Sequence, residues 1–146
     1  MFVKLKNNRG FTLIEVLLVV AIIAILAGIV ILAVNPAKQL GDTRNAERRA
    51  DVNTILNAVY QYGIDLHGVP ATLPNSPVDI CATGGSGSCV DLHVLTDSGK
   101  YLVKMPEDPQ LGDANDTHYQ ISEDGNGRIT VSAPGAEQGV TITATR

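Results

Sequence analysis

The stretch GFTLIEVLLVVAIIAILAGIVILAV, residues 10–34, divides this chain of 146 residues into two unlike parts. Between Phe11 and Val34 the only charged residue is Glu15. After Asn35 the chain becomes polar, rich in turn-forming residues and acidic, although its overall hydrophobic fraction of 45% is ordinary. A chain of this length has room for one modest domain beside such a segment. The sequence therefore predicts an apolar anchor followed by a water-exposed head.

The apolar segment is long enough to cross a membrane. As a helix, the 24 residues from Phe11 to Val34 extend about 36 Å, against a hydrocarbon core of about 30 Å. A helix buried inside a soluble protein is the alternative. However, residues 16–34 are apolar on every side, and so small a head cannot surround them. We therefore expect this segment to be inserted in a membrane.

The residues before the apolar segment predict its orientation. Lys4, Lys6 and Arg9 come first, with no acid among them, and basic residues favour the cytoplasmic side. The head is therefore expected to be exported. A secretory signal has a shorter apolar core with its cleavage site after it, whereas here the small residue, Gly10, comes before the core. Cleavage at Gly10 would remove the basic leader, residues 1–10, and keep the anchor.

The residues GFTLIE, followed by an apolar helix, resemble the processing motif of type IV prepilins and of the pseudopilins of type II secretion. The resemblance covers about the first 35 residues. In that family a membrane peptidase cleaves after the glycine and methylates the new N-terminus. The resemblance therefore implies cleavage after Gly10, N-methylation of Phe11 and a role for Glu15 in filament assembly.

A charge argument supports this role for Glu15. Cleavage would leave the amine of Phe11 charged at the end of an apolar helix, where an unpaired charge is costly. Glu15 lies about one helical turn further on, so the carboxylate of one subunit can meet the amine of a neighbour that is offset along a filament. The alternative is a lone acid that reaches the lipid headgroups.

The helix is expected to continue past a kink at Asn35 and Pro36, because proline lacks a backbone donor and disfavours helical geometry in the residue before it. One buried stripe follows the helical spacing i, i+3, i+4, i+7: Val52, Ile55, Leu56, Val59, Tyr62 and Leu66. The opposite face is expected to be solvated: Arg44, Glu47, Arg48, Asp51 and Asn53. Gly68 and Pro70 are stop signals.

The basic residues near the start of this second helical region invite a nucleic-acid interpretation. Acids are interleaved with them, and no aromatic residue accompanies them for base stacking. Helical ion pairs, Arg44 with Glu47 and Arg48 with Asp51, are the favoured interpretation. We therefore expect no nucleic acid among the partners of the isolated subunit.

The region after Pro70 is expected to be a small antiparallel sheet. Candidate strands are VDLHVL (90–95), KYLVKM (100–105), HYQIS (118–122), RITVSA (128–133) and VTITAT (140–145), the last three separated by EDGNG and PGAEQG. The predicted fold is α+β and pilin-like, with a long N-terminal helix packed on a small β-meander. The predicted divisions are a leader (1–10), a membrane and filament-core helix (11–34), an amphipathic continuation (35–68) and a head (69–146).

Cys81 and Cys89 are the only two cysteines. They end a flexible glycine and serine loop in a head that we expect to be exported, which favours a disulfide over two free thiols. Zinc needs about four ligands, and two cysteines with scattered histidines do not supply them.

No constellation of residues indicates an enzyme. The histidines, His67, His93 and His118, lie far apart, and the chain has no nucleophile-elbow or phosphate-loop pattern. We expect no cofactor. Calcium is the minority alternative, because the acid-rich loops lack the spacing of a known calcium site. Its candidate ligands are Asp108, Asp113, Asp116, Asp124 and Asn126.

The resemblance implies a structural subunit of a type IV pilus, with a pseudopilin of a type II secretion system as the alternative. A membrane-anchored binding domain that never polymerises is a weaker third hypothesis. The implied partners are a prepilin peptidase, other copies of the chain in a helical filament, an assembly platform and the membrane. The implied location is the cytoplasmic membrane before assembly, and a cell-surface or periplasmic filament afterwards.

Overall fold

A computed structural model describes residues 10–66, 68–82, 88–113 and 115–146. Most of the predicted basic leader, residues 1–9, and the middle of the loop between the cysteines lie outside these ranges. The chain divides into two compact units, one ending at Ala37 and the other comprising Lys38–Arg146. Each unit is described by itself.

Helix α1, Leu13–Ala33, accounts for most of the first unit. Its residues are aliphatic apart from Glu15, and none of them is buried in the subunit. It is the one helix of the described chain that is long and apolar enough to span a membrane, with a mean hydropathy of 3.4. At about 1.5 Å per residue, 21 residues extend about 32 Å.

A short non-helical link replaces the predicted kink. Val34 has extended backbone angles, φ −99° and ψ 104°, and helix α2, Pro36–Leu66, begins two residues later. Proline suits the first position of a helix because its missing N–H would have no partner there. It also disfavours helical geometry in the residue before it, which here is Asn35. The prediction of one continuous helix from the anchor into the head was therefore wrong at this point.

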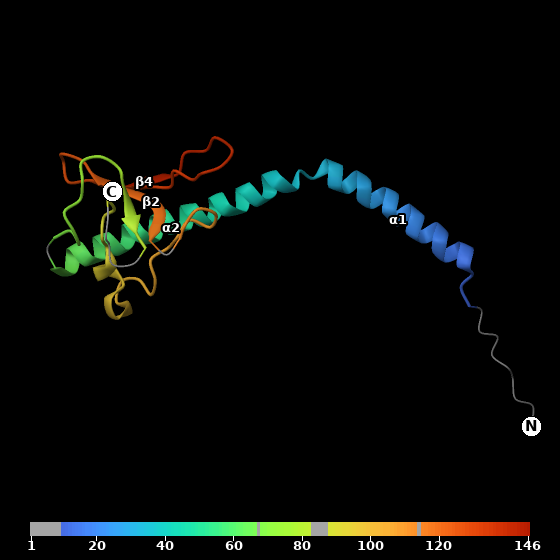
Figure 1. The fold of residues 1–146 in the computed structure, drawn as a ribbon, viewed down its shortest axis with the longest axis horizontal. Helices are drawn as coiled ribbons and strands as arrows, with labels where there is room; N and C mark the ends of the chain where they lie inside the picture. Colours follow the sequence, from blue (N-terminus) through green and yellow to red (C-terminus); the bar gives the residue numbers. More distant parts are fainter. Residues whose placement is uncertain (1–9, 67, 83–87, 114) are drawn as a thin grey trace, which may run out of the picture. The chain divides into compact units, whose positions relative to one another are not determined.

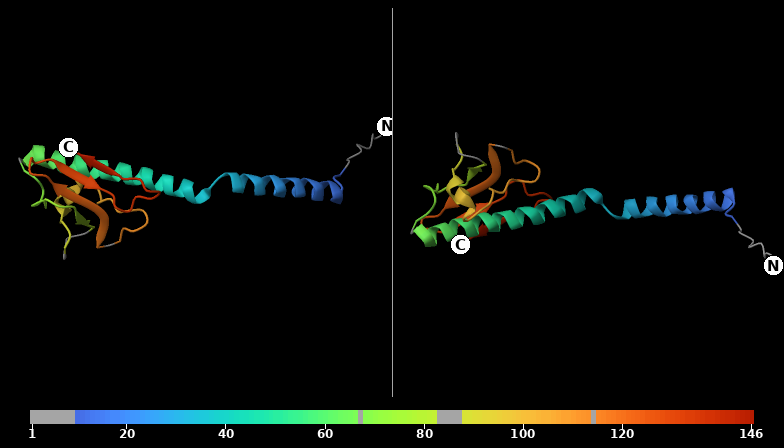
Figure 2. Two further views of the ribbon diagram at one scale, coloured as in Figure 1. Left: turned by 90° about the horizontal axis from the view of Figure 1, so that it is seen from above. Right: turned by 90° about the horizontal axis from the view of Figure 1, so that it is seen from below.

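The second unit contains the predicted antiparallel meander. Its strands are β1 (Val78–Cys81), β2 (Asp116–Glu123), β3 (Ile129–Ser132) and β4 (Thr143–Thr145), in the order β1-β2-β3-β4. The predicted EDGNG turn joins β2 to β3, and Gly127 in it has φ +78°. The sheet covers one side of α2 (Figure 1), and most of the opposite side is uncovered in both views of Figure 2, although Arg146 reaches Asn57 and Tyr60 in the second half of the helix. This is the predicted α+β, pilin-like fold.

Two predicted strands, residues 90–95 and 100–105, are wrong, and strand β1 (Val78–Cys81) was not predicted. Within residues 90–95 only Val90 pairs, in an isolated bridge with Ile80, and a 3-10 turn follows at His93–Leu95. Residues 100–105 form no strand. The alternation in VDLHVL was misleading because Leu92 and Leu95 are buried at the three-residue spacing of a 3-10 turn.

The core lies between α2 and the sheet. From the helix it contains Val52, Ile55, Leu56 and Val59, as predicted; from the strands it contains Ile80, Tyr119, Ile121, Ile129 and Val131. Tyr62 is half-buried. Leu66, which was predicted to be buried, is 58% exposed at the last residue of the helix.

Candidate functional site

The peptide bond between Gly10 and Phe11 lies just ahead of α1 in non-helical, exposed backbone. Among the described residues, apart from its neighbour in the chain, none has an atom within 4 Å of the position that a Cβ on Gly10 would occupy. The Phe11 side chain is 84% exposed. Exposed segments outside secondary structure are the usual sites of cleavage, so the geometry leaves this bond open to a peptidase.

Glu15 takes part in a capping box at the start of α1. The backbone N–H of Glu15 donates to the Thr12 hydroxyl at 3.3 Å, and the Thr12 N–H faces the Glu15 carboxylate at 3.5 Å. Both contacts satisfy N–H groups that a helix end otherwise leaves free. The sequence interpretation missed this role, although the spacing Thr-x-x-Glu before an apolar run is its signature. Glu15 therefore has a local function in the helix, besides any pairing with a neighbour.

The site in the head that sequence reasoning missed is a cluster of charges on α2. Arg48 donates from Nε to Asp108 Oδ2 at 2.6 Å and from Nη2 to Asp108 Oδ1 at 3.0 Å. Both side chains are fully buried. The hydrogen bond to Asp108 raises the pKa of Arg48 most, although burial opposes it. Burial raises the pKa of Asp108, but the hydrogen bonds from Arg48 and from two backbone N–H groups lower it overall.

The loop between β3 and β4 completes this cluster through Glu137. Arg44 makes two hydrogen bonds of 2.6 Å to the Glu137 carboxylate, and Arg48 Nη1 donates to it at 3.0 Å. Asn45 fixes the backbone of the same residue: its Nδ2 donates to the Glu137 carbonyl, and its Oδ1 accepts from the Glu137 N–H, both at 3.0 Å. Arg44 and then Arg48 hold the pKa of Glu137 at about 2.

These contacts overturn the helical ion pairs that were predicted on α2. Arg44 pairs with Glu137 instead of Glu47, and Arg48 pairs with Asp108 instead of Asp51. The carboxylate of Asp51 instead accepts a 2.7 Å hydrogen bond from the Tyr119 hydroxyl. Burial, which the hydrogen bond opposes, raises the pKa of Asp51.

One signal in the sequence could have placed Arg48 inside. It precedes Val52 by four residues and Ile55 by seven, so it lies on the buried stripe of α2. Glu47 and Asn53 are exposed, as predicted for the other face.

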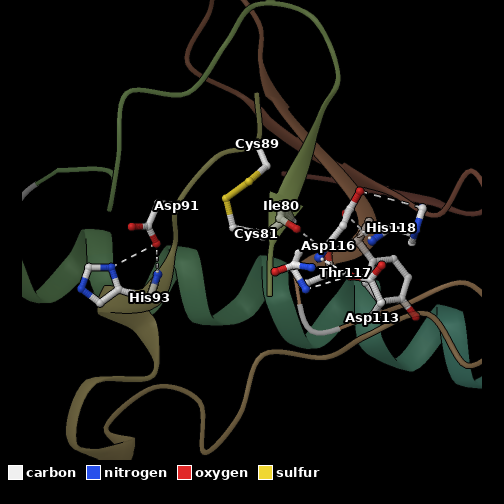
Figure 3. Close-up of a disulfide and its surroundings, with 11 residues drawn as sticks. Ile80, Cys81, Cys89, Asp91, His93, Asp113, Asp116, Thr117 and His118 are labelled. Atoms are coloured by element: carbon white, nitrogen blue, oxygen red, sulfur yellow. Dashed lines mark hydrogen bonds and ion pairs between the residues drawn. A yellow bond between two sulfur atoms is a disulfide. The ribbon is translucent and has the colours of Figure 1, made fainter. Parts of the chain in front are cut away.

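The predicted disulfide joins Cys81 to Cys89, with their Cα atoms 5.3 Å apart (Figure 3). Cys81 is the last residue of β1. Beside it, the Cys81 N–H donates to the Val90 carbonyl at 3.0 Å, and the Val90 N–H donates to the Asp79 carbonyl at 2.7 Å. The disulfide therefore reinforces the point where the chain returns to the edge of the sheet.

The candidate calcium ligands have other contacts. Asp108 pairs with Arg48, whereas Asp113, Asp116 and Asp124 accept hydrogen bonds from backbone N–H groups two to four residues ahead. Asn126 contributes its backbone N–H to one of these turns.

The described histidines also contact near neighbours in the chain. His93 bonds to Asp91 and His118 lies beside Asp116 (Figure 3), whereas His67 falls outside the described residues. Within the ranges that the structure describes, no three His, Cys, Asp or Glu side chains are grouped to hold a metal ion.

Comparisons with known proteins agree with the N-terminal site. Residues 5–31 match the family model described as the prokaryotic N-terminal methylation motif. The chain is 36% identical over 66 residues to the type II secretion system core protein G of Escherichia coli (strain K12). This match covers 45% of the chain and 44% of the relative, so the chain spans less than half of the relative's length. No solved structure matches significantly.

Neither description names an enzymatic activity. The apolar α1 and the methylation motif together indicate that the N-terminal segment inserts in a membrane. The motif, the relative, and the fold of an N-terminal helix with an antiparallel sheet agree with the resemblance of this chain to type IV pilins and to the pseudopilins of type II secretion.

Proposed function

We propose that the chain is a structural subunit of a type IV pilus or a pilus-like filament. It is inserted in the cytoplasmic membrane with its N-terminus inside, cleaved after Gly10, N-methylated at Phe11 and polymerised through α1. The observation that carries the proposal is the exposed Gly10–Phe11 bond, directly before an apolar helix with no buried residue and a single acid in its first turn.

The assembly step follows from the cost of exposed apolar surface. All of α1 lacks cover within the subunit. When the helix leaves lipid, its apolar surface must be covered by protein, because exposing it to water would cost about 25 cal/mol per Å². Other copies of the same helix supply that surrounding in a filament, where Glu15 of one copy neutralises the Phe11 amine of the next. The proposed partners are therefore a prepilin peptidase, an assembly platform and further copies of the chain; no cofactor is required.

A second candidate is a pseudopilin of a type II secretion system, with a short periplasmic filament. The observation that favours it is the similarity to the secretion system core protein G. The processing and assembly steps are the same in both candidates. Surface filaments that vanish when the gene is deleted support the pilus. Loss of secretion of folded proteins, with surface filaments unchanged, supports the pseudopilin.

The capping box makes the test of Glu15 sharper. Glu15→Gln keeps a side-chain acceptor for the Thr12 N–H, because glutamine also serves in capping boxes, but it removes the charge. Thr12→Ala removes the hydroxyl acceptor and keeps the carboxylate. We expect Glu15→Gln to be processed normally and to fail in filament assembly, and Thr12→Ala to be processed and to assemble.

Two measurements decide this test. Intact mass of the extracted protein shows whether the chain begins with a methylated Phe11, and electron microscopy counts filaments. A mature chain that still begins at Met1 contradicts the processing step. Normal filaments built from processed Glu15→Gln alone would show that capping, and not charge, is the purpose of the acid.

A further inference from the structure

The bare side of α2 carries charges that the subunit does not neutralise. The sheet lies against the other side of this helix (Figure 2), so residues here face outward. Glu47 and Arg49 are exposed on this side. Asp51 is half-buried at its edge, where its carboxylate accepts a hydrogen bond from the Tyr119 hydroxyl of β2.

Among the lysines and arginines that the structure describes in the head, Arg49 is the one whose charge has no side-chain partner. Within the described part of Lys38–Arg146, every other lysine or arginine has a side-chain partner: Lys38 with Asp42, Arg44 with Glu137, Arg48 with Asp108, Lys100 with Asp65, Lys104 with Glu107, Arg128 with Asp124 and Arg146 with Asn57. The structure gives the guanidinium of Arg49 no such partner. Its charge is therefore available to another molecule.

Glu47 and Asp51 carry negative charges that could pair with a cation such as Arg49. They stand four residues apart on α2, and the proximity of Glu47 contributes to the raised pKa of Asp51. Like charges at this spacing destabilise a helix by a few tenths of a kcal/mol. Among the described residues, Glu47 has no cationic partner, and the side-chain partner of Asp51 is the hydroxyl of Tyr119. A cation from outside would relieve this repulsion.

The two charges lie on opposite flanks of the helix. At 3.6 residues per turn, a separation of two residues turns about 200° around the axis, so Arg49 points away from Glu47. The exposed surface between the flanks is uncharged and, apart from Asn53, is formed by small residues: Thr43, Ala46, Ala50 and Thr54. The hydroxyls of both threonines donate back to helix carbonyls, at 3.0 and 2.8 Å. A second helix can therefore approach this surface closely.

We propose that the exposed side of α2 docks a second copy of the chain, with Arg49 of one copy paired to Glu47 and Asp51 of its neighbour. This inference rests on the proposed function, because it assigns a contact between subunits of the filament. Since the two complementary surfaces differ, the contact is head-to-tail, and each copy leaves one surface of each kind free for the next. Such a contact extends an open filament.

A charge swap in the full-length chain tests the pairing. Arg49→Glu alone and Glu47→Arg alone should each lower the number of filaments about tenfold or more, because like charges then face one another between copies. The double variant Glu47→Arg with Arg49→Glu should restore filaments to within about threefold of wild type. Lys104→Glu makes the same change in net charge as Arg49→Glu, elsewhere on the head, and should leave filaments unchanged. Immunoblotting of the processed chain controls for abundance.

A second measurement reports proximity directly. Cells that produce Glu47→Cys and Arg49→Cys chains together should yield disulfide-linked dimers, and Lys104→Cys with Arg49→Cys should yield about tenfold fewer. If wild type forms filaments, but the double variant is no better than either single variant and no dimers form, the pairing is wrong and the proposed function stands. If the wild-type chain forms neither surface filaments nor periplasmic filaments, the proposed function fails, and the pairing fails with it.

Discussion

Arg48 and Asp108, sixty residues apart in the chain, form a two-point ion pair in which neither side chain has exposed surface. Their contact joins α2 to the segment that leads into β2. Through Glu137, Arg48 also reaches the loop between β3 and β4. One helix residue therefore holds two distant loops of the head, and it does so with charges in place of apolar contacts.

The head should fold without the anchor. Lys38–Arg146 is a compact unit whose apolar core is complete, whereas the large exposed apolar surface belongs to α1. We expect a fragment of residues 38–146, made in the periplasm, to be soluble and monomeric with one disulfide. Gel filtration and circular dichroism check this. An aggregated or unfolded fragment would show that the head depends on α1.

Breaking the buried ion pair should destabilise this fragment strongly. Arg48→Met leaves the Asp108 charge buried without its partner, and removal of one member of such a pair costs about 3–5 kcal/mol. Asp108→Asn should cost a similar amount. The double variant should lose clearly less than the sum of the two single losses. Urea unfolding measures all three, and additive losses would mean that the two side chains act independently.

Acid should weaken the contact of Glu137. Its pKa is about 2 in the folded chain, against an ordinary 4.5, because of Arg44 and Arg48. A lower pKa in the folded state means that protonation favours unfolding, so this stabilisation is complete above about pH 4.5 and is lost as the pH falls toward 2. Glu137→Gln should therefore melt below wild type at neutral pH, and the gap should close between these two pH values. A constant gap would contradict the argument.

The disulfide should stabilise the head independently of the charge cluster. A loop with a sequence separation of 8 contributes about 2.5 kcal/mol by the chain-entropy relation. Replacing Cys81 and Cys89 together by serine should lower the free energy of unfolding by about this amount. Reducing agent should lower wild type equally and leave the serine variant unchanged. If wild type and the serine variant were equally stable under oxidising conditions, the disulfide would not stabilise the head.

Gly41 leaves room for the loop that carries Glu137. A Cβ on Gly41 would lie 2.5 Å from Nε2 of Gln138, which donates to the Lys38 carbonyl at 2.7 Å. Gly41→Ala gains helix propensity, worth up to about 1 kcal/mol, but it displaces this amide. We therefore expect Gly41→Ala to raise the stability of the head by this full amount only in a chain that also carries Gln138→Ala. A double-mutant cycle by thermal unfolding checks the coupling, and equal effects of Gly41→Ala in both backgrounds would exclude it.

The sequence by itself determined the features that depend on local pattern. The apolar run to Val34 predicts a membrane-length helix because its composition leaves no polar face. The stripe from Val52 to Val59 predicts the buried side of α2 because helical spacing aligns these residues. The glycines after Asp124 predict the β2–β3 turn, and two cysteines predict one disulfide. Thr12 and Glu15 also carried a local signature, the capping box, which the interpretation overlooked.

Only the tertiary structure decided the partners of the charges on α2. Sequence spacing offers Arg44 the near acid Glu47, yet it pairs with Glu137, 93 residues away. Local rules cannot predict this choice, because exposed helical ion pairs contribute only a few tenths of a kcal/mol, and the fold overrides them once it brings other carboxylates close. The same holds for Leu92 and Leu95, which are buried in a 3-10 turn and not in a strand. Periodicity predicts which residues are buried, and only tertiary packing decides which residues they contact.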